Sequence, residues 1–194
     1  MPDVPAGRRR SRRTKQLDLV PEDDGSFTFH ASLVDESFGG NYESGADSLV
    51  IHHFVIDGRV GDDLTLLDLS VEAEEHPFPQ CPFVLPAAQD LIGLGLSAGW
   101  RRTVLDAFRG SAGCTHVTTL LLGLSEVVTL IYFQRMNRGA AYGPHTRASG
   151  EWIAGSLDLA PDLGGACHAL AEDGPVLRQA ARFRHRGDRA DDLS

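Results

Sequence analysis

The chain has 194 residues, of which 42% are hydrophobic and 23% charged, values typical of a soluble globular protein with one core. The net charge of −9 is unevenly distributed, because residues 1–16 carry six basic side chains and one acidic one, a net +5, which leaves −14 on the remainder. An acidic body argues against nucleic acid as the main partner, since phosphate binding needs a basic face. No uninterrupted apolar run of 18 residues occurs, so we expect no membrane span and a cytoplasmic protein.

Four segments of the first half have the pattern of β-strands. In the second of them, Phe27, Phe29, Ala31 and Leu33 alternate with polar residues, as in a strand with one buried face. Short turns rich in Asp and Gly connect the segments, which predicts an antiparallel meander. The predicted strands are Gln16–Val20, Ser26–Asp35, Ser48–Ile56 and Leu64–Glu74.

The second half has a helical pattern after the proline-rich segment EHPFPQCPFVLP, which is incompatible with a regular helix or a central strand. We expect helices over 87–94, 97–108, 115–136 and 174–183, with a loop over 137–150. The fold class is therefore α+β, an antiparallel sheet of about four strands packed by helices from the C-terminal half. We expect a basic disordered tail over 1–15, one domain over 16–184 and a frayed charged tail over 185–194.

The strongest candidates for chemistry lie at the start of the longest apolar segment, where the sequence reads Gly113-Cys114-Thr115-His116. A thiolate is stabilised at a helix N-terminus, and His116 could act as its base or as a second metal ligand. Residues two apart in a helix point to roughly opposite sides, so Cys114 and His116 converge only if Cys114 precedes the first turn. Otherwise Cys114 or Thr115 simply caps the helix.

Further cysteines and histidines could complete such a site. Three cysteines, an odd number without a secretion signal, favour free thiols, metal ligands or a nucleophile over a disulfide framework. Neighbouring histidines on a strand point to opposite faces, so at most one of His52 and His53 reaches the site. Zinc or non-haem iron would suit this ligand chemistry. The candidate metal ligands are Cys81, Cys114, His116, His52, Cys167 and His168, with Asp68, Glu72 and Asp90 as possible carboxylate partners.

The segments DDGSFTFHASLVDES, LVIHHFVID, HPFPQCP, LIGLGLSAGW, GSAGCTHVTTLL and ACHALAEDGPVL occur in an order that resembles a bacterial family known as domain of unknown function 2889. The resemblance extends from about Arg12 to about Val176. It implies that Cys81, Cys114, His116 and Cys167-His168 belong to one site. The family has His-Asp where this chain has His52-His53. The resemblance therefore implies that His52 corresponds to the family's histidine and that His53 replaces its aspartate.

Three functions fit these residues. The first is a small catabolic enzyme, a metal-dependent or thiol-dependent lyase or hydrolase, with Cys114 and His116 as catalytic residues and a small organic acid or aromatic compound as substrate. The second is a non-catalytic accessory subunit whose long apolar helix packs on a partner or a second copy. The third is a carrier of a metal or a cluster.

Overall fold

The computed structural model of the chain describes residues 9–96 and 99–191. Its contacts cluster into two compact units, residues 1–128 and residues 129–194, where we had expected one domain over 16–184. The boundary lies inside helix α3 (Ser125–Met136). Each unit is therefore described by itself.

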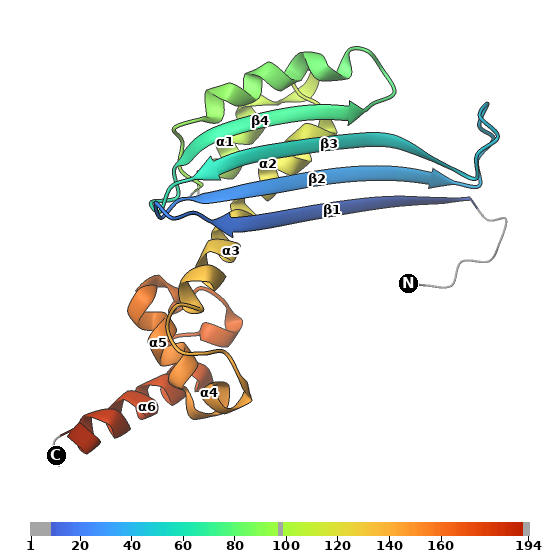
Figure 1. Ribbon diagram of the computed structural model, residues 1–194. Helices are drawn as coiled ribbons and strands as arrows, with labels where there is room; N and C mark the ends of the chain where they lie inside the picture. The colour runs from blue at the N-terminus through green and yellow to red at the C-terminus, as the bar shows by residue number, and fades with distance from the viewer. Residues whose placement is uncertain (1–8, 97–98, 192–194) are drawn as a thin grey trace. The chain divides into compact units, whose positions relative to one another are not determined.

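The first unit contains a four-stranded antiparallel sheet in the order β1-β2-β3-β4 (Figure 1), which confirms the predicted fold class. Short connections between successive strands produce this meander, because each strand pairs with the one that precedes it. The strands are β1 (Arg10–Pro21), β2 (Phe27–Phe38), β3 (Ser48–Val60) and β4 (Leu66–Glu75).

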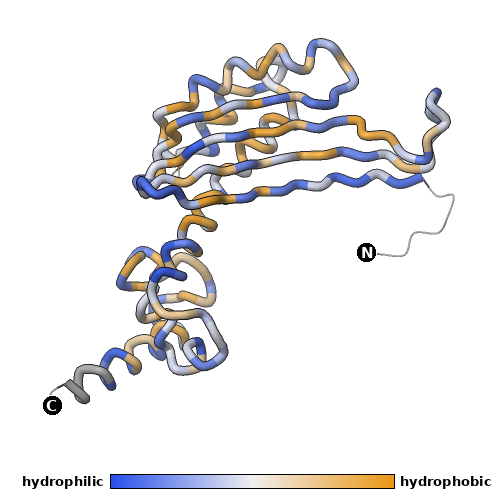
Figure 2. Tube along the Cα trace, viewed as in Figure 1, coloured by the Kyte–Doolittle hydropathy of each residue, from blue (hydrophilic) through white to orange (hydrophobic). Residues whose placement is uncertain are grey.

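Strand β1 begins six residues before the predicted start at Gln16, inside the segment that we had expected to be a disordered tail. Acidic and aromatic residues of β2 explain the difference. Arg13 forms an ion pair with Asp35, and the guanidinium of Arg10 lies 4.0 Å from the ring centroid of Phe38. The prediction of disorder is therefore wrong for residues 10–15, while residues 1–8 lie outside the described part. Figure 2 shows β1 as a largely hydrophilic strand.

One face of the sheet is buried and carries the odd-numbered residues of β2. Phe27, Phe29, Ala31 and Leu33 are each at most 3% exposed, and the register places Phe54 beside Leu33 on β3. Helical segments cover this face (Figure 1). They are the 3₁₀ segment η1 (Cys81–Leu91), α1 (Trp100–Ala107), the 3₁₀ turn η2 (Gly110–Ala112) and α2 (Thr115–Gly123).

The helices differ from the predicted ones in their bounds. The proline-rich segment contributes to η1, whose 3₁₀ hydrogen bonds accommodate Pro86, so helical structure starts at Cys81 and not at Ala87. Helix α1 begins at Trp100, and residues 97–98, where we had placed its start, lie outside the described part. The buried indole Nε1 of Trp100 donates a 2.7 Å hydrogen bond to the carbonyl of Leu121, which fixes α1 against α2.

The long helix predicted over 115–136 is interrupted at Leu124, which separates α2 from α3. By length and composition the combined 22 residues are long and apolar enough to cross a membrane, a test that core helices of soluble proteins also pass. Leu121, Leu124 and Val127 are fully buried in the protein, while only 33% of the most apolar 18-residue window of this segment is buried. Localisation itself stays a prediction.

The second unit is helical and has its own small cores. Helix α4 (Pro144–Ser149), inside the predicted loop, ends at Gly150, and α5 (Glu151–Leu159) starts there. Gly150 has φ of 88°, and a Cβ atom would lie 2.6 Å from the carbonyl oxygen of Gln179, so only glycine fits. Two 3₁₀ turns, η3 (Pro161–Leu163) and η4 (His168–Leu170), precede α6 (Pro175–Asp191). Residues 185–191, predicted to be frayed, thus belong to a helix.

Candidate functional site

A row of three polar residues crosses the buried face of the sheet at one end of its core. The register pairs Arg13 with Asp35 and Asp35 with His52, so the three side chains share a face with Leu33 and Phe54. The register between β2 and β3 shifts just after Asp35, because Glu36 pairs with Val50 and not with Ile51. A β-bulge of this kind redirects side chains and is frequent next to functional sites.

The N-terminus of α2 brings a thiol and an imidazole to the same place. Cys114 is the N-cap residue, with φ of −114° and ψ of 133°, and therefore precedes the first helical turn. Its Sγ lies 3.5 Å from Nδ1 of His116, the convergence that the sequence allowed only for this conformation. Gly113 permits the approach, because a Cβ atom there would lie 2.3 Å from the carbonyl oxygen of Phe108.

Asp35 connects the helix to the sheet. Its Oδ2 lies 3.2 Å from Nε2 of His116 and 3.1 Å from Nδ1 of His52. The two imidazole rings stack with centroids 3.7 Å apart, and the ring of Phe54 lies 5.5 Å from that of His116. The side chains of Asp35, His52 and His116 are 15–18% exposed, so the cluster is largely but not completely shielded from water.

Arg13 determines the charge of this cluster. Its guanidinium donates two hydrogen bonds of 2.7 Å to the two carboxylate oxygens of Asp35. These hydrogen bonds hold the pKa of Asp35 below its ordinary value. The pKa of His116 is lowered, first by desolvation and second by the neighbouring His52. Near neutral pH the pair therefore consists of an aspartate anion and a neutral imidazole.

This charge state determines the tautomer of His116. A carboxylate only accepts hydrogen bonds, so Nε2 of His116 carries the proton that faces Asp35. The lone pair of the neutral ring then lies on Nδ1, toward the Cys114 sulfur. Cys114, His116 and Asp35 thus form a chain of thiol, base and carboxylate, in which the base is ready to accept the thiol proton.

The other predicted site residues lie elsewhere. Cys81 is partly buried at the start of η1, His53 is on the opposite face of the sheet in an ion pair with Glu74, and Cys167 is exposed. Cys167 and His168 belong to the second unit. Within residues 9–96 and 99–191, the one group of three or more potential metal ligands with mutually close atoms is Asp35, His52 and His116.

The sequence interpretation missed Asp35 and Arg13, having named Asp68, Glu72 and Asp90 as carboxylate partners. A signal for Asp35 was present in the sequence. The alternation of Phe27, Phe29, Ala31 and Leu33 continues to Asp35, which places a carboxylate on the core face of its strand. A charged residue at such a position needs a partner, and Arg13 supplies it from the adjacent strand.

The donor set of Asp35, His52 and His116 resembles the two-histidine, one-carboxylate set of non-haem iron sites. The Asp35 carboxylate, however, already accepts two hydrogen bonds from the Arg13 guanidinium. A metal cation bound to Asp35 would therefore lie beside this positive charge. In the arrangement described, both carboxylate oxygens are engaged by hydrogen bonds. A metal ion at this position would therefore compete with the arginine and the two imidazoles for the carboxylate oxygens.

The chain matches one protein family over residues 11–130, a segment that contains all of the sheet except Arg10. The matched segment includes the residues Arg13, Asp35, His52, Cys114 and His116. No curated protein and no solved structure matches the chain. Because the match covers more than half of the sequence, the chain belongs to the family described as protein of unknown function (DUF2889).

Proposed function

We propose that this protein is a thiol-dependent hydrolase that cleaves an activated acyl compound, an ester or thioester of a small organic acid. One observation supports this proposal above all others. The Cys114 sulfur lies 3.5 Å from one nitrogen of His116, whose other nitrogen lies 3.2 Å from the Asp35 carboxylate. Nucleophile, base and orienting carboxylate recur in this order in unrelated thiol and serine enzymes.

In the first step, the Cys114 thiol gives its proton to Nδ1 of His116 and its sulfur attacks the acyl carbonyl carbon. The imidazolium that forms is stabilised by the Asp35 carboxylate at Nε2. When the tetrahedral intermediate collapses, the carbon–oxygen or carbon–sulfur bond to the leaving group breaks. The leaving alkoxide or thiolate takes the proton from Nδ1, and the acyl group remains on Cys114 as a thioester.

In the second step, water attacks the thioester carbonyl while His116 accepts its proton. The bond to sulfur breaks, the carboxylic acid leaves, and the proton returns to Cys114. The sum of both steps is hydrolysis, with water as the co-reactant. The neutral state of His116 favoured by desolvation is the form that both steps need.

The start of α2 provides hydrogen-bond donors for the oxyanion of each step. The first helical bond runs from the N–H of Thr118 to the carbonyl of Cys114, so the preceding N–H groups of α2 lack partners within the helix. Cys114 makes no side-chain capping bond to them. Donors of this kind beside a nucleophile stabilise developing negative charge, and each is worth about 3 kcal/mol in well-formed oxyanion holes.

His52 acts as a positioning residue. It donates from Nδ1 to the same Asp35 oxygen that faces His116, and its ring stacks on the ring of His116. The stack restricts the orientation of the base, while the second donor helps to keep Asp35 anionic. The sheet thus holds the carboxylate, and the helix supplies the nucleophile and the base.

The proposal is tested with p-nitrophenyl butyrate as probe. Wild-type protein should release p-nitrophenol with an initial burst, and the peptide that contains Cys114 should carry the butyryl group after rapid acid quenching. Cys114→Ala should lack both the burst and the adduct. Cys81→Ala removes another partly buried thiol and serves as the matched control, with activity close to wild type. Equal turnover by Cys114→Ala would overturn the proposal.

A second candidate is a metal-dependent enzyme or a metal carrier, favoured by the mutual approach of ligand atoms from Asp35, His52 and His116 to within 4.8 Å. Elemental analysis of protein purified without a metal-affinity tag distinguishes the two. The thiol proposal expects no stoichiometric zinc or iron. A stoichiometric metal that is lost in His52→Gln would instead support the metal centre.

Partners and location are further parts of the proposal. An acidic body and a semi-enclosed polar cluster suit a small-molecule substrate in the cytoplasm better than nucleic acid or a membrane surface. The alternative role as an accessory subunit, with α2 and α3 packed on a partner or a second copy, predicts self-association of the purified chain. Analytical ultracentrifugation tests it.

A further inference from the structure

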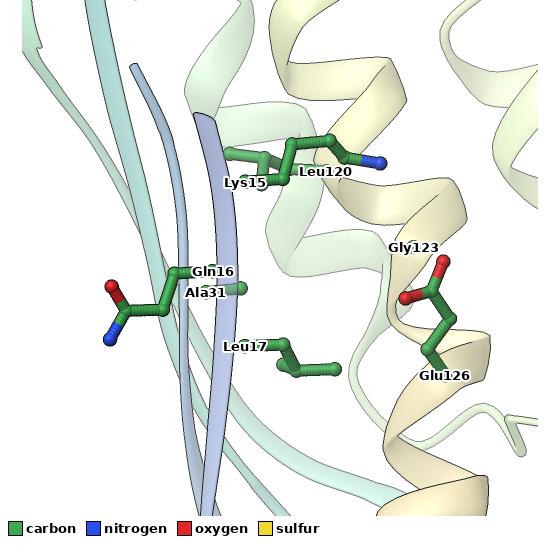
Figure 3. A pocket seen from close by; sticks show the side chains of 7 residues that line it. All are labelled: Lys15, Gln16, Leu17, Ala31, Leu120, Gly123 and Glu126. Atoms are coloured by element: carbon green, nitrogen blue, oxygen red, sulfur yellow. The ribbon is translucent and has the colours of Figure 1, made fainter. Parts of the chain in front are cut away.

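Two depressions border strand β1 in the first unit, and one of them is lined by residues of the thiol site. The other is a crevice between β1 and α2, whose lining includes Lys15, Leu120 and Gly123 (Figure 3). Its volume is about 80 Å³, whereas small-molecule sites usually have roughly 300 Å³ or more. Among the described residues, none of those that form the thiol site lines this crevice.

The depression that meets the thiol site is an open groove on the sheet. Strands β1, β2 and β3 extend past α2 at this end, so the start of α2 does not cover the whole face (Figure 1). The groove has a volume of about 460 Å³, within the range of small-molecule sites. Three residues of the site line it, Arg13, Asp35 and His52, together with Ser11, Ser37 and Ile51.

The alternation along the strands determines which side chains face the groove. Ser11 pairs with Ser37 two positions along the strands from Arg13, so these three side chains share one face. Arg12 and Glu36 also border the groove, but their side chains alternate to the opposite face, where they form an ion pair with each other. The groove therefore presents one guanidinium and two hydroxyl groups beside the Asp35 carboxylate.

Hydrogen-bond donors without partners outnumber acceptors among these groups. Arg13 donates to Asp35 from Nε and Nη2, and within the described residues its Nη1, which carries two hydrogens, has no partner. The hydroxyls of Ser11 and Ser37 make no hydrogen bond to a described residue either. Both oxygens of Asp35, by contrast, already accept hydrogen bonds. A group that only accepts hydrogen bonds, such as a carboxylate, therefore matches the groove.

The neighbouring charges favour a carboxylate over a phosphate. Asp35 lies in the groove as an anion, and it repels any second anion. A carboxylate carries one negative charge, whereas a phosphate monoester carries about 1.5 to 2 near neutral pH and is repelled more strongly. A planar carboxylate also fits the planar edge of a guanidinium.

Asp35 and His52 connect the groove to the thiol. His116 contacts both, because its Nε2 lies 3.2 Å from Oδ2 of Asp35 and its ring centroid lies 3.7 Å from that of His52. The Cys114 sulfur lies 3.5 Å from Nδ1, the other nitrogen of the same ring. One imidazole thus separates the nucleophile from the groove, and an acyl chain of a few methylenes is long enough to pass it.

We infer that the groove binds a free carboxylate at the far end of the acyl group, so that the substrates are half-esters or half-thioesters of dicarboxylic acids. The inference rests on the proposed function and specifies its substrate class. The acyl carbonyl lies at Cys114, and the free carboxylate accepts hydrogen bonds from Nη1 of Arg13 and from the hydroxyls of Ser11 and Ser37. Arg13 then holds two carboxylates, one of the protein and one of the substrate.

The test compares mono-p-nitrophenyl adipate with p-nitrophenyl hexanoate, which has the same number of acyl carbons but no second carboxylate. Relative to hydrolysis by hydroxide, kcat/KM of the wild type should be at least about tenfold higher for the adipate, since hydrogen bonds to a charged group are strong. About 1 M potassium chloride should reduce this preference, because salt screens exposed charges. Equal values for the two esters in the wild type would overturn the inference.

Charge substitutions locate the preference in the groove. Ser11 is exposed on the edge strand, so Ser11→Asp leaves the core intact, and its negative charge should abolish the preference for adipate. Ser11→Lys should increase it, which a general disturbance of the fold would not do. Ser32→Asp adds the same charge to the opposite face of β2 and is the matched control, with a preference within about twofold of the wild type. An equal loss in Ser11→Asp and Ser32→Asp would contradict binding in the groove.

Alkylation of Cys114 separates a failure of this inference from a failure of the proposed function. N-iodoacetyl-γ-aminobutyrate should alkylate Cys114 faster than N-butyl iodoacetamide in the wild type, and Ser11→Asp should remove the difference. Glutarate should protect Cys114 from the anionic reagent better than inorganic phosphate at equal ionic strength, and the reverse order would overturn the choice of a carboxylate.

The two assays together distinguish the outcomes. Ester turnover without a preference for the charged compound in either assay would sink the groove and leave the hydrolase. A charge preference in alkylation that Ser11→Asp removes, without turnover of any ester, would keep the groove as a carboxylate site and overturn the hydrolase. No turnover and no preference would overturn both.

Discussion

Asp35→Asn is the most informative substitution, because it preserves shape and removes one charge. In the wild type the carboxylate accepts the Nε2 proton of His116 at 3.2 Å, which leaves the Nδ1 lone pair facing Cys114 at 3.5 Å. An asparagine amide can donate to Nε2 instead and would then stabilise the tautomer with its proton on Nδ1. That tautomer cannot accept the proton of Cys114.

The expected magnitude follows from the contact that is lost. A hydrogen bond to a charged group contributes about 1.5–3 kcal/mol. At 1.36 kcal/mol for each factor of ten, the rate at which Cys114 reacts should fall roughly 10- to 150-fold. The assay is the rate of iodoacetamide alkylation resolved by peptide, which needs no knowledge of the substrate. The exposed Cys167 provides an internal standard whose rate should not change.

Glu36→Gln is the matched control. Glu36 is the neighbour of Asp35 on β2 and forms its ion pair with Arg12 at 3.4 Å, so the variant loses the same charge from the same strand. Both variants should lose only about 1 kcal/mol of unfolding free energy, because the arginine partners are partly exposed. Equal Cys114 rates in Asp35→Asn and wild type, or an equal fall in Glu36→Gln, would refute the proposed role of Asp35.

Acid should destabilise the fold in two stages. The lowered pKa of His116 means that the unfolded chain binds a proton more readily, so stability is full above pH 6.5 and falls as the pH drops below that value. The lowered pKa of Asp35 removes further stability as the pH falls below 3.8 and through the pKa of the folded state. Urea unfolding at stepped pH measures both, and a flat profile between about pH 7 and 5 would contradict the first. Gly113→Ala should cost about 1–3 kcal/mol, because its Cβ would overlap the carbonyl of Phe108, and should slow alkylation of Cys114. Wild-type stability and reactivity in this variant would show that the tight turn is not required.

The sheet could be predicted because its pattern is local. Alternation with period two and Asp-Gly turns predict strands and their order, and the structure has the predicted meander. The start of β1 could not be read in the same way, because RSRRTK has no hydrophobic alternation. Its strand conformation depends on partners such as Asp35, Glu36 and Phe38, which lie more than twenty residues later in the chain.

The candidate site was predictable on the helix side and only partly on the sheet side. The Gly-Cys-Thr-His turn indicates a thiol and a base at a helix start from four adjacent residues. The role of Asp35 depends on strand register, since a shift of one residue would move its side chain to the other face. The alternation along β3 did not show whether His52 or His53 faces the site, because both faces of the strand carry apolar residues. The register shift after Asp35 also cannot be read from the sequence.

The break at Leu124 also escaped prediction, and it lies next to the boundary between the two compact units of the structure. The run from Thr115 to Met136 has the composition of one continuous helix, and Ser125 and Glu126 interrupt its apolar stretch near the observed break. Where compact units separate depends on which apolar faces find partners, and these contacts are not local in sequence. The small cores around Met136 and Ile153 lie in the second unit.

The most direct test of a catalytic thiol is the order in which the three cysteines of the wild-type protein are alkylated, measured by peptide under limiting iodoacetamide. Exposure alone would make Cys167 the fastest, because it is exposed while Cys81 and Cys114 are partly buried. Activation by His116 and Asp35 predicts that Cys114 reacts first and that this advantage declines as the pH falls through the lowered pKa of His116 and the imidazole is protonated. If Cys167 reacts first and Cys114 behaves like Cys81 at every pH, the chain of thiol, base and carboxylate does not function as proposed.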